Sequence, residues 1–125
     1  HILFPKGMRT ITNPPCITSL PKAVGVVTTY HVERFGNLQT IIHTLLDSCT
    51  FSRVVAFNNN PRKRLQAEHP SVQVINAQKN ISTISKYEGC VAGGEGSCYI
   101  IDGDWLPMHV GTMYRLFLEH GAKFL

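Results

Sequence analysis

Hydrophobic and polar positions follow two different periods along the chain, and the changes of period predict its elements. Residues 23–30 (Ala-Val-Gly-Val-Val-Thr-Thr-Tyr) are apolar or β-branched on both faces, which is typical of a central parallel strand. Over residues 35–49 the apolar positions recur every three or four residues, and this spacing predicts an amphipathic helix. Residues 53–58 and 72–76 predict a second and a third strand.

Capping signals and shorter patterns predict the remaining elements. Asn60 followed by Pro61 is a favourable helix start and predicts a short helix between the second and third strands. Residues 81–91 fit either a helix or a partly irregular segment, whereas 98–101 predict a fourth strand and 109–120 a last helix. The side of this last helix that we expect to be buried holds Val110, Met113, Leu116 or Phe117, and His120.

This alternation of strands and helices predicts an α/β fold of three layers, α/β/α, with a mostly parallel sheet between helices. Right-handed crossovers bring the carboxyl ends of all the strands to one edge of such a sheet. Residues 1–22 contain four prolines and are expected to form a lead-in or linker to a domain over 23–125. Three polar clusters are expected to meet at the carboxyl edge: Thr28-Thr29-Tyr30, Asn58-Asn59-Asn60 and Asp102-Gly103-Asp104.

Composition narrows the class of protein. At 125 residues, with 43% hydrophobic and 16% charged residues, the chain is one folded domain or part of one. It opens on His1 without a leader, so we expect a piece of a longer chain, and its apolar runs are too short to span a membrane. The net charge of +4 comes from scattered basic residues, which predicts no nucleic-acid partner.

The four cysteines have no spacing that fits a zinc site or a Cys-x-x-Cys pair. Cys49 falls on the face of the predicted helix and Cys98 in an apolar strand, so both are predicted to be small core residues. Their pattern leaves the compartment open between the lumen of the secretory pathway and the cytoplasmic face of a membrane.

The strongest candidate for chemistry is the Asp-Gly-Asp triplet that ends the fourth strand. Asp102 and Asp104 stand one residue apart, and Gly103 lets the backbone turn tightly between them. Carboxylate oxygens at this spacing suit Mg²⁺ or Mn²⁺ bridging to a diphosphate. The bare triplet is also an ordinary way for a strand to enter a turn, because Asp and Gly are common turn residues.

The order of these segments resembles the nucleotide-binding half of GT-A-fold glycosyltransferases, most closely the family 2 type. The first strand ends in Thr-Thr-Tyr before a helix that ends in Leu-Leu-Asp-Ser, and the second strand ends in polar residues. The segment Ile-Ile-Asp-Gly-Asp-Trp-Leu-Pro at 100–107 is similar to the family's Asp-x-Asp segment with its trailing Trp-Leu-Pro. The match covers about residues 23–107 and implies a Rossmann-like nucleotide-diphospho-sugar transferase fold that is truncated here.

The resemblance also implies which residues contact the nucleotide. Thr28 and Tyr30 would line the base and the ribose, and Thr29 would lie between them at the same edge. Glu33 follows the first strand and is counted with this nucleotide-sugar-binding set.

Two further positions come from the later strands. Asn58 or Asn59 would stand where the family has an acidic residue that contacts the nucleotide. Asp102 would face the ribose or the metal, and Asp104 would bind the divalent Mn²⁺ or Mg²⁺ that bridges the diphosphate.

The implied activity is metal-dependent transfer of a sugar, of the hexosyltransferase kind, from a nucleotide-diphosphate sugar to an unknown acceptor. The family's catalytic base and acceptor site lie beyond the end of this chain, so the fragment can be inactive alone and its catalytic residues are not assigned. Two alternatives stay open: a degenerate, non-catalytic GT-A-like module, and a Mg²⁺-dependent nucleotidyltransferase. The second class commonly has a glycine-rich, basic loop after the first strand, where this chain has Thr-Thr-Tyr-His.

Overall fold

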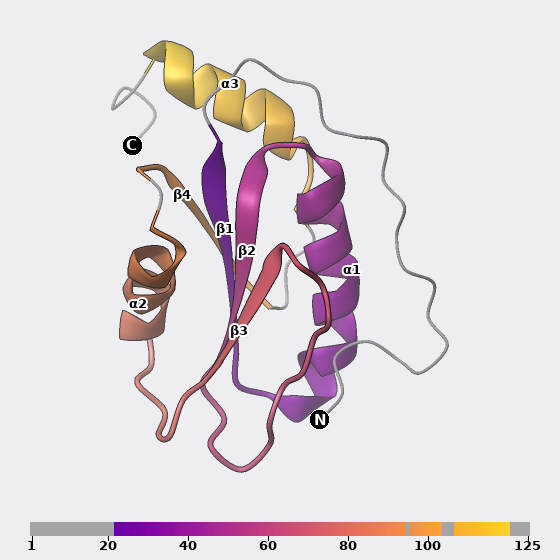
Figure 1. Cartoon of the computed structure of the whole chain (residues 1–125), viewed down its shortest axis with the longest axis vertical. Helices are drawn as coiled ribbons and strands as arrows, with labels where there is room; N and C mark the ends of the chain where they lie inside the picture. Colours follow the sequence, from indigo (N-terminus) through magenta and orange to yellow (C-terminus); the bar gives the residue numbers. More distant parts are fainter. Residues whose placement is uncertain (1–21, 95, 104–106, 121–125) are drawn as a thin grey trace.

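The chain folds as an α/β domain in a computed structural model that describes residues 22–94, 96–103 and 107–120 (Figure 1). The predicted lead-in therefore lies outside the described residues, except for Lys22. The elements, in order, are β1 (Ala23–Thr29), the short 3-10 helix η1 (Val32–Arg34), α1 (Phe35–Asp47), β2 (Phe51–Asn58), β3 (Val72–Asn76), α2 (Ile84–Gly93), β4 (Cys98–Asp102) and α3 (Val110–His120).

The four strands of the described sheet are all parallel and stand in the order β3-β2-β1-β4. The chain therefore adds strands to one side of β1 first and returns to its other side with β4. This reversal sets the carboxyl ends of β1 and β4 side by side, with Thr28 paired to Asp102 in the register. The predicted α/β class and parallel sheet are confirmed.

Helices cover both faces of the sheet, α1 on one side and α2 on the other (Figure 1). The predicted apolar stripe of α1 is buried: Leu38, Ile42 and Leu45 are fully enclosed in a core that includes Val27 of β1. An amphipathic helix packs its apolar stripe on the sheet and exposes its polar side to water. The apolar periodicity of the sequence was therefore enough to predict how α1 packs.

A smaller core lies between the sheet and α2, around Val24 and Val26 of β1. Two glycines of α2 allow its backbone to come close to these side chains. A Cβ added at Gly89 would stand 2.6 Å from Cγ1 of Val26, and one at Gly93 would collide with Val24. The segment over residues 81–91, which fitted either a helix or a partly irregular segment, thus contains most of helix α2. This helix packs on β1 through its glycines.

The prediction of a short helix after Asn60 is wrong. No helix forms among residues 60–71; the Asn60 side-chain oxygen instead accepts a hydrogen bond from the Arg62 amide at 2.9 Å. Farther along, the Asn76 side chain bonds the amide of Leu65 at 2.8 Å and its carbonyl at 3.0 Å. These side-chain bonds satisfy the backbone of an irregular connection, so the chain passes from β2 to β3 without a helix.

The last helix lies across the amino ends of the strands (Figure 1), and its predicted buried side is only partly buried. Val110 is enclosed, but Met113, Leu116 and Phe117 are each more than one third exposed, and His120 is exposed. The three apolar side chains border an apolar groove of about 340 Å³ at the amino edge of the sheet. No charged side chain is found in its described lining.

The prediction that Cys49 and Cys98 are small core residues is also wrong. Cys98 is exposed and forms a disulfide with Cys90, with a Cα–Cα distance of 5.9 Å, and Cys49 is disulfide-bonded as well. The bond joins the last turns of α2 to the first residue of β4. Disulfides persist in oxidising compartments, which favours the secretory lumen of the two compartments considered.

No helix in the described parts of the chain is both long enough and apolar enough to cross a membrane.

Candidate functional site

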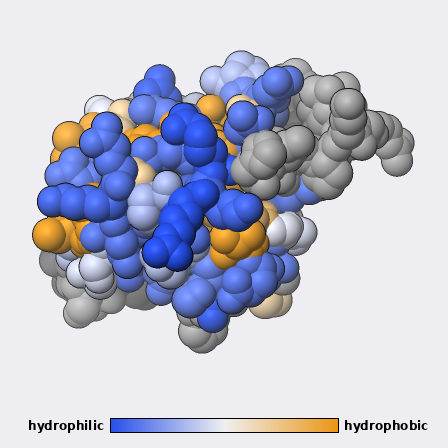
Figure 2. All heavy atoms as spheres, turned by 90° about the horizontal axis from the view of Figure 1, so that it is seen from below, coloured by the Kyte–Doolittle hydropathy of each residue, from blue (hydrophilic) through white to orange (hydrophobic). Residues whose placement is uncertain are grey.

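A cleft of about 420 Å³ opens at the carboxyl edge of the sheet, where β1, β4 and the start of α2 meet. This end of the molecule carries a mostly hydrophilic surface (Figure 2). The cleft brings together five of the residues that the sequence singled out: Thr28, Thr29, Tyr30, Asn59 and Asp102.

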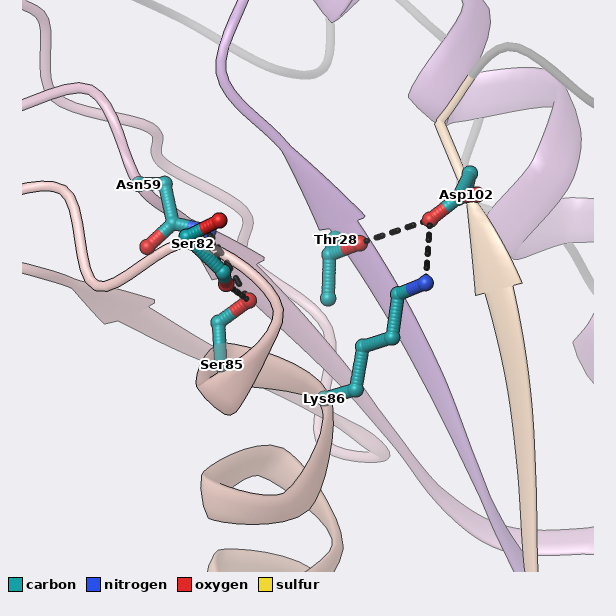
Figure 3. Close-up of polar contacts among 6 residues, drawn as sticks. All are labelled: Thr28, Asn59, Ser82, Ser85, Lys86 and Asp102. Carbon is teal, nitrogen blue, oxygen red and sulfur yellow. Dashed lines mark hydrogen bonds and ion pairs between the residues drawn. The ribbon is translucent and has the colours of Figure 1, made fainter.

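The Asp102 carboxylate lines the cleft and makes polar contacts with residues of β1 and α2 (Figure 3). Its Oδ1 accepts a hydrogen bond from the Thr28 hydroxyl at 3.3 Å and lies 3.3 Å from the Nζ of Lys86. The parallel register places Thr28 and Asp102 side by side, and the Gly103 amide donates to the Thr28 carbonyl at 2.8 Å. Strand pairing and the Gly103 turn therefore position the carboxylate.

The start of α2 adds positive charge to this cleft. Lys86 lies in the first turn of the helix, which contains no acidic residue. Because the amino end of a helix carries a partial positive charge, the ammonium of Lys86 adds to it rather than balancing it. Arg34 lines the same cleft, so Asp102 is the one carboxylate that faces these cations in the described lining.

Asn59 joins the end of β2 to the loop before α2 (Figure 3). Its side-chain nitrogen donates to the Ser85 hydroxyl at 2.8 Å and to the Ser82 carbonyl at 3.3 Å, while its oxygen accepts from the Ile81 amide at 3.2 Å. A carboxylate here could not donate to the Ser82 carbonyl. The hydrogen bonds to the loop before α2 therefore require an amide at position 59, where the resembled family has an acidic residue.

Asn58 has a different place. Its side chain is fully buried, donates to the Lys63 carbonyl at 2.6 Å and to the Asn76 side chain at 2.9 Å, and accepts from the Asn60 amide at 2.9 Å. It does not line the cleft. These three hydrogen bonds hold the β2–β3 connection, so we retain Asn59 and not Asn58 in the candidate site.

The segment after β1 supplies two contrasting positions. Tyr30 is 44% exposed at the cleft, and its ring stands nearly perpendicular to that of His31, with 5.3 Å between the ring centroids. The Glu33 side chain is 76% exposed and pairs with His31 at 3.5 Å; His31 lines the cleft, and Glu33 does not. The exposed Tyr30 ring can contact a ligand in the cleft, whereas Glu33 does not line the cleft and leaves the candidate site.

Thr29 carries an unusual hydroxyl. The residue is 6% exposed and lines the cleft, and its Oγ1 has no hydrogen-bond partner within the described ranges. Leaving a buried hydroxyl unbonded costs about 1–3 kcal/mol. A ligand oxygen or nitrogen that reached this atom would remove that cost.

The described residues offer a divalent cation an incomplete set of ligands. Across residues 22–94, 96–103 and 107–120, no group of three or more His, Cys, Asp or Glu side chains could hold a metal. Asp104, the other predicted ligand, lies outside the described residues. One carboxylate still fits Mg²⁺ or Mn²⁺ chemistry, since Mg²⁺ in proteins is often held by one or two carboxylates with substrate phosphates and waters.

Lys86 is the residue that the sequence interpretation missed. Its segment was left between helix and loop, so no side chain could be assigned to the edge of the sheet. A signal was available: Ser85, Gly89 and Gly93 stand four residues apart, which is typical of a helix face packed closely on its neighbour. A helix that packs through these three residues begins beside the carboxyl edge of the sheet, and Lys86 then lies in its first turn at that edge.

No known family model matches the chain, and a search of curated proteins finds no match either. The features of the chain that bear on function are the position of the cleft in the sheet, its volume and the charges that line it.

Proposed function

We propose that this chain is the donor-binding half of a metal-dependent glycosyltransferase with a GT-A fold, similar to the family 2 type, and that the cleft binds a nucleotide-diphosphate sugar. The observation that carries the proposal is the pairing of Thr28 and Asp102 across β1 and β4, at the point where the strand order reverses. In open α/β sheets, ligands bind in the crevice at such a point, beyond the carboxyl ends of the strands. The cleft volume, about 420 Å³, lies within the range of small-molecule sites.

The lining supports a role for each part of such a ligand. The Tyr30 ring and the Thr29 hydroxyl suit the base and the ribose, because one offers a flat apolar face and the other an unused polar atom. Lys86 and Arg34 suit the phosphates, since both cations border the same cleft.

Asp102 would hold the ribose or a divalent metal in this proposal, with Asp104 as the second metal ligand. When bound, the metal would offset the negative charge that develops on the departing diphosphate. The chain's own residues bind and orient the donor.

One observation favours the alternative of a non-catalytic GT-A-like module. The Asp102 carboxylate is already paired with Lys86, so part of its charge is neutralised within the protein. A module that had lost metal-dependent catalysis could retain such a pair as a purely structural contact.

Melting curves with ligands separate the two proposals. We expect UDP or GDP with Mn²⁺ to raise the melting temperature of the wild-type chain, and Asp102→Asn to remove most of that shift. Glu68→Gln is the matched control, because Glu68 is an exposed carboxylate outside the cleft, and it should retain the shift. If no nucleotide stabilises the wild type with or without Mn²⁺, the donor-binding proposal is wrong and the non-catalytic module is favoured.

A further inference from the structure

One oxygen of the Asp102 carboxylate in the cleft, Oδ1, is paired with a cationic side chain of the protein itself. Lys86 Nζ and the Thr28 hydroxyl both stand 3.3 Å from Asp102 Oδ1, and Figure 3 shows them converging on it from α2 and β1. The Lys86 side chain is 30% exposed and that of Asp102 is 48% exposed, so the pair is neither sealed from water nor fully solvated.

The position of Lys86 explains why it needs this partner. An ammonium in the first turn of α2 is repelled by the helix dipole, and no acidic residue in that turn balances it. Arg34 is a second cationic residue in the described lining. Asp102 is therefore the local counter-charge, and any other cation that binds its carboxylate competes with Lys86.

We propose that Lys86 is the resident counter-cation of Asp102: a divalent metal must displace its ammonium from the carboxylate, and the displaced ammonium then binds the phosphates of the nucleotide. This inference rests on the proposed nucleotide-binding function. A lysine is suited to the exchange, because its charge is compact and sits on a flexible four-carbon stem.

The exchange couples the two ligands. A diphosphate that draws Lys86 away frees Asp102 for the metal, and a metal on Asp102 frees Lys86 for the diphosphate. By linkage, each ligand must then strengthen the binding of the other by the same factor. Removing the ammonium should therefore change the affinities for metal alone and nucleotide alone in opposite directions.

Calorimetric titrations with Mn²⁺ alone and with UDP alone test this in the full chain. In Lys86→Met, the affinity for Mn²⁺ should rise by about two- to fivefold, which is the range expected from releasing a partly exposed ion pair. The affinity for UDP without metal should fall in the same variant. Lys86→Arg should keep both affinities near the wild-type values because it keeps the charge.

Lys79→Met is the control for net charge, because Lys79 is exposed in the loop before α2 and does not line the cleft. It should alter neither affinity. Melting curves of all variants without ligand verify that the fold is retained.

The outcomes separate this inference from the function on which it rests. If Lys86→Met weakens UDP binding but leaves Mn²⁺ binding unchanged, or alters neither, the counter-cation proposal is overturned while donor binding stands. If the wild type fails to bind UDP with or without Mn²⁺, the proposed function is overturned, and the phosphate half of this inference with it.

Discussion

The close packing of α2 on β1 predicts a cost for adding a single methyl group. In Gly89→Ala the new Cβ would stand 2.6 Å from Cγ1 of Val26, well inside van der Waals contact. Val26 is fully buried and its β-branched side chain has little rotamer freedom, so the helix itself has to move. Overpacking of this kind costs about 1–3 kcal/mol, against a gain of about 0.5–1 kcal/mol from replacing glycine by alanine within a helix.

We therefore expect Gly89→Ala to lower the free energy of unfolding by up to roughly 2.5 kcal/mol, the difference between these two terms. Gly36→Ala is the matched control, because Gly36 lies in α1 and a Cβ there would meet no atom within 4 Å. It should stabilise the chain by up to about 1 kcal/mol.

Urea denaturation measures both variants, and an unchanged m-value verifies that the same surface is exposed on unfolding. If Gly89→Ala stabilised the chain as much as Gly36→Ala, the close approach of α2 to β1 would be refuted. The placement of Lys86 beside Asp102 would lose its support at the same time, because α2 carries that lysine.

Three further predictions test other parts of the account. Leu45→Ala should lower the free energy of unfolding by about 2–5 kcal/mol in urea, because Leu45 is fully buried against the sheet, and a loss below about 0.5 kcal/mol would contradict that packing. Replacing Cys90 and Cys98 together by serine should cost roughly 2 kcal/mol, as expected for a cross-link between residues eight apart, and equal stability of the variant and the wild type would rule out the bond. Burial lowers the pKa of His43 below 6.5, although Asp47 opposes the shift. The unfolded chain then binds the proton more readily, so stability should fall as the pH drops below about 6.5, and His43→Gln should reduce that fall in melting curves measured from pH 7 to pH 5.

The sequence predicted those helices and strands whose own residues are enough to indicate the type of element. The apolar stripe of α1 recurs every three or four residues, which a helix buries on one face, and β1 is a short apolar run rich in β-branched residues, which favours a buried strand. The missing helix after Asn60 shows the limit of such local signals. Its capping sequence is favourable, but Asn76, far along the chain, bonds the backbone of Leu65 and holds the connection in another form.

The candidate site was predicted in outline, and its details required the three-dimensional arrangement. Thr28 and Asp102 could be assigned to one edge because parallel strands end together. Asn58 and Asn59 are adjacent in the sequence, and only the structure separates the buried one from the one at the cleft. The disulfide of Cys90 could not be foreseen, because sequence spacing does not reveal which cysteines meet.

The most direct test of the account is to locate bound Mn²⁺ by nuclear magnetic resonance. Mn²⁺ is paramagnetic and broadens the amide signals of nearby residues, so a titration of isotope-labelled chain with Mn²⁺ and UDP maps where the metal binds. The account predicts that broadening begins at the amides of Thr28, Lys86 and Gly103, around the Asp102 carboxylate, and is lost in Asp102→Asn. Broadening that begins at α3 instead, or that persists unchanged in Asp102→Asn, would contradict it.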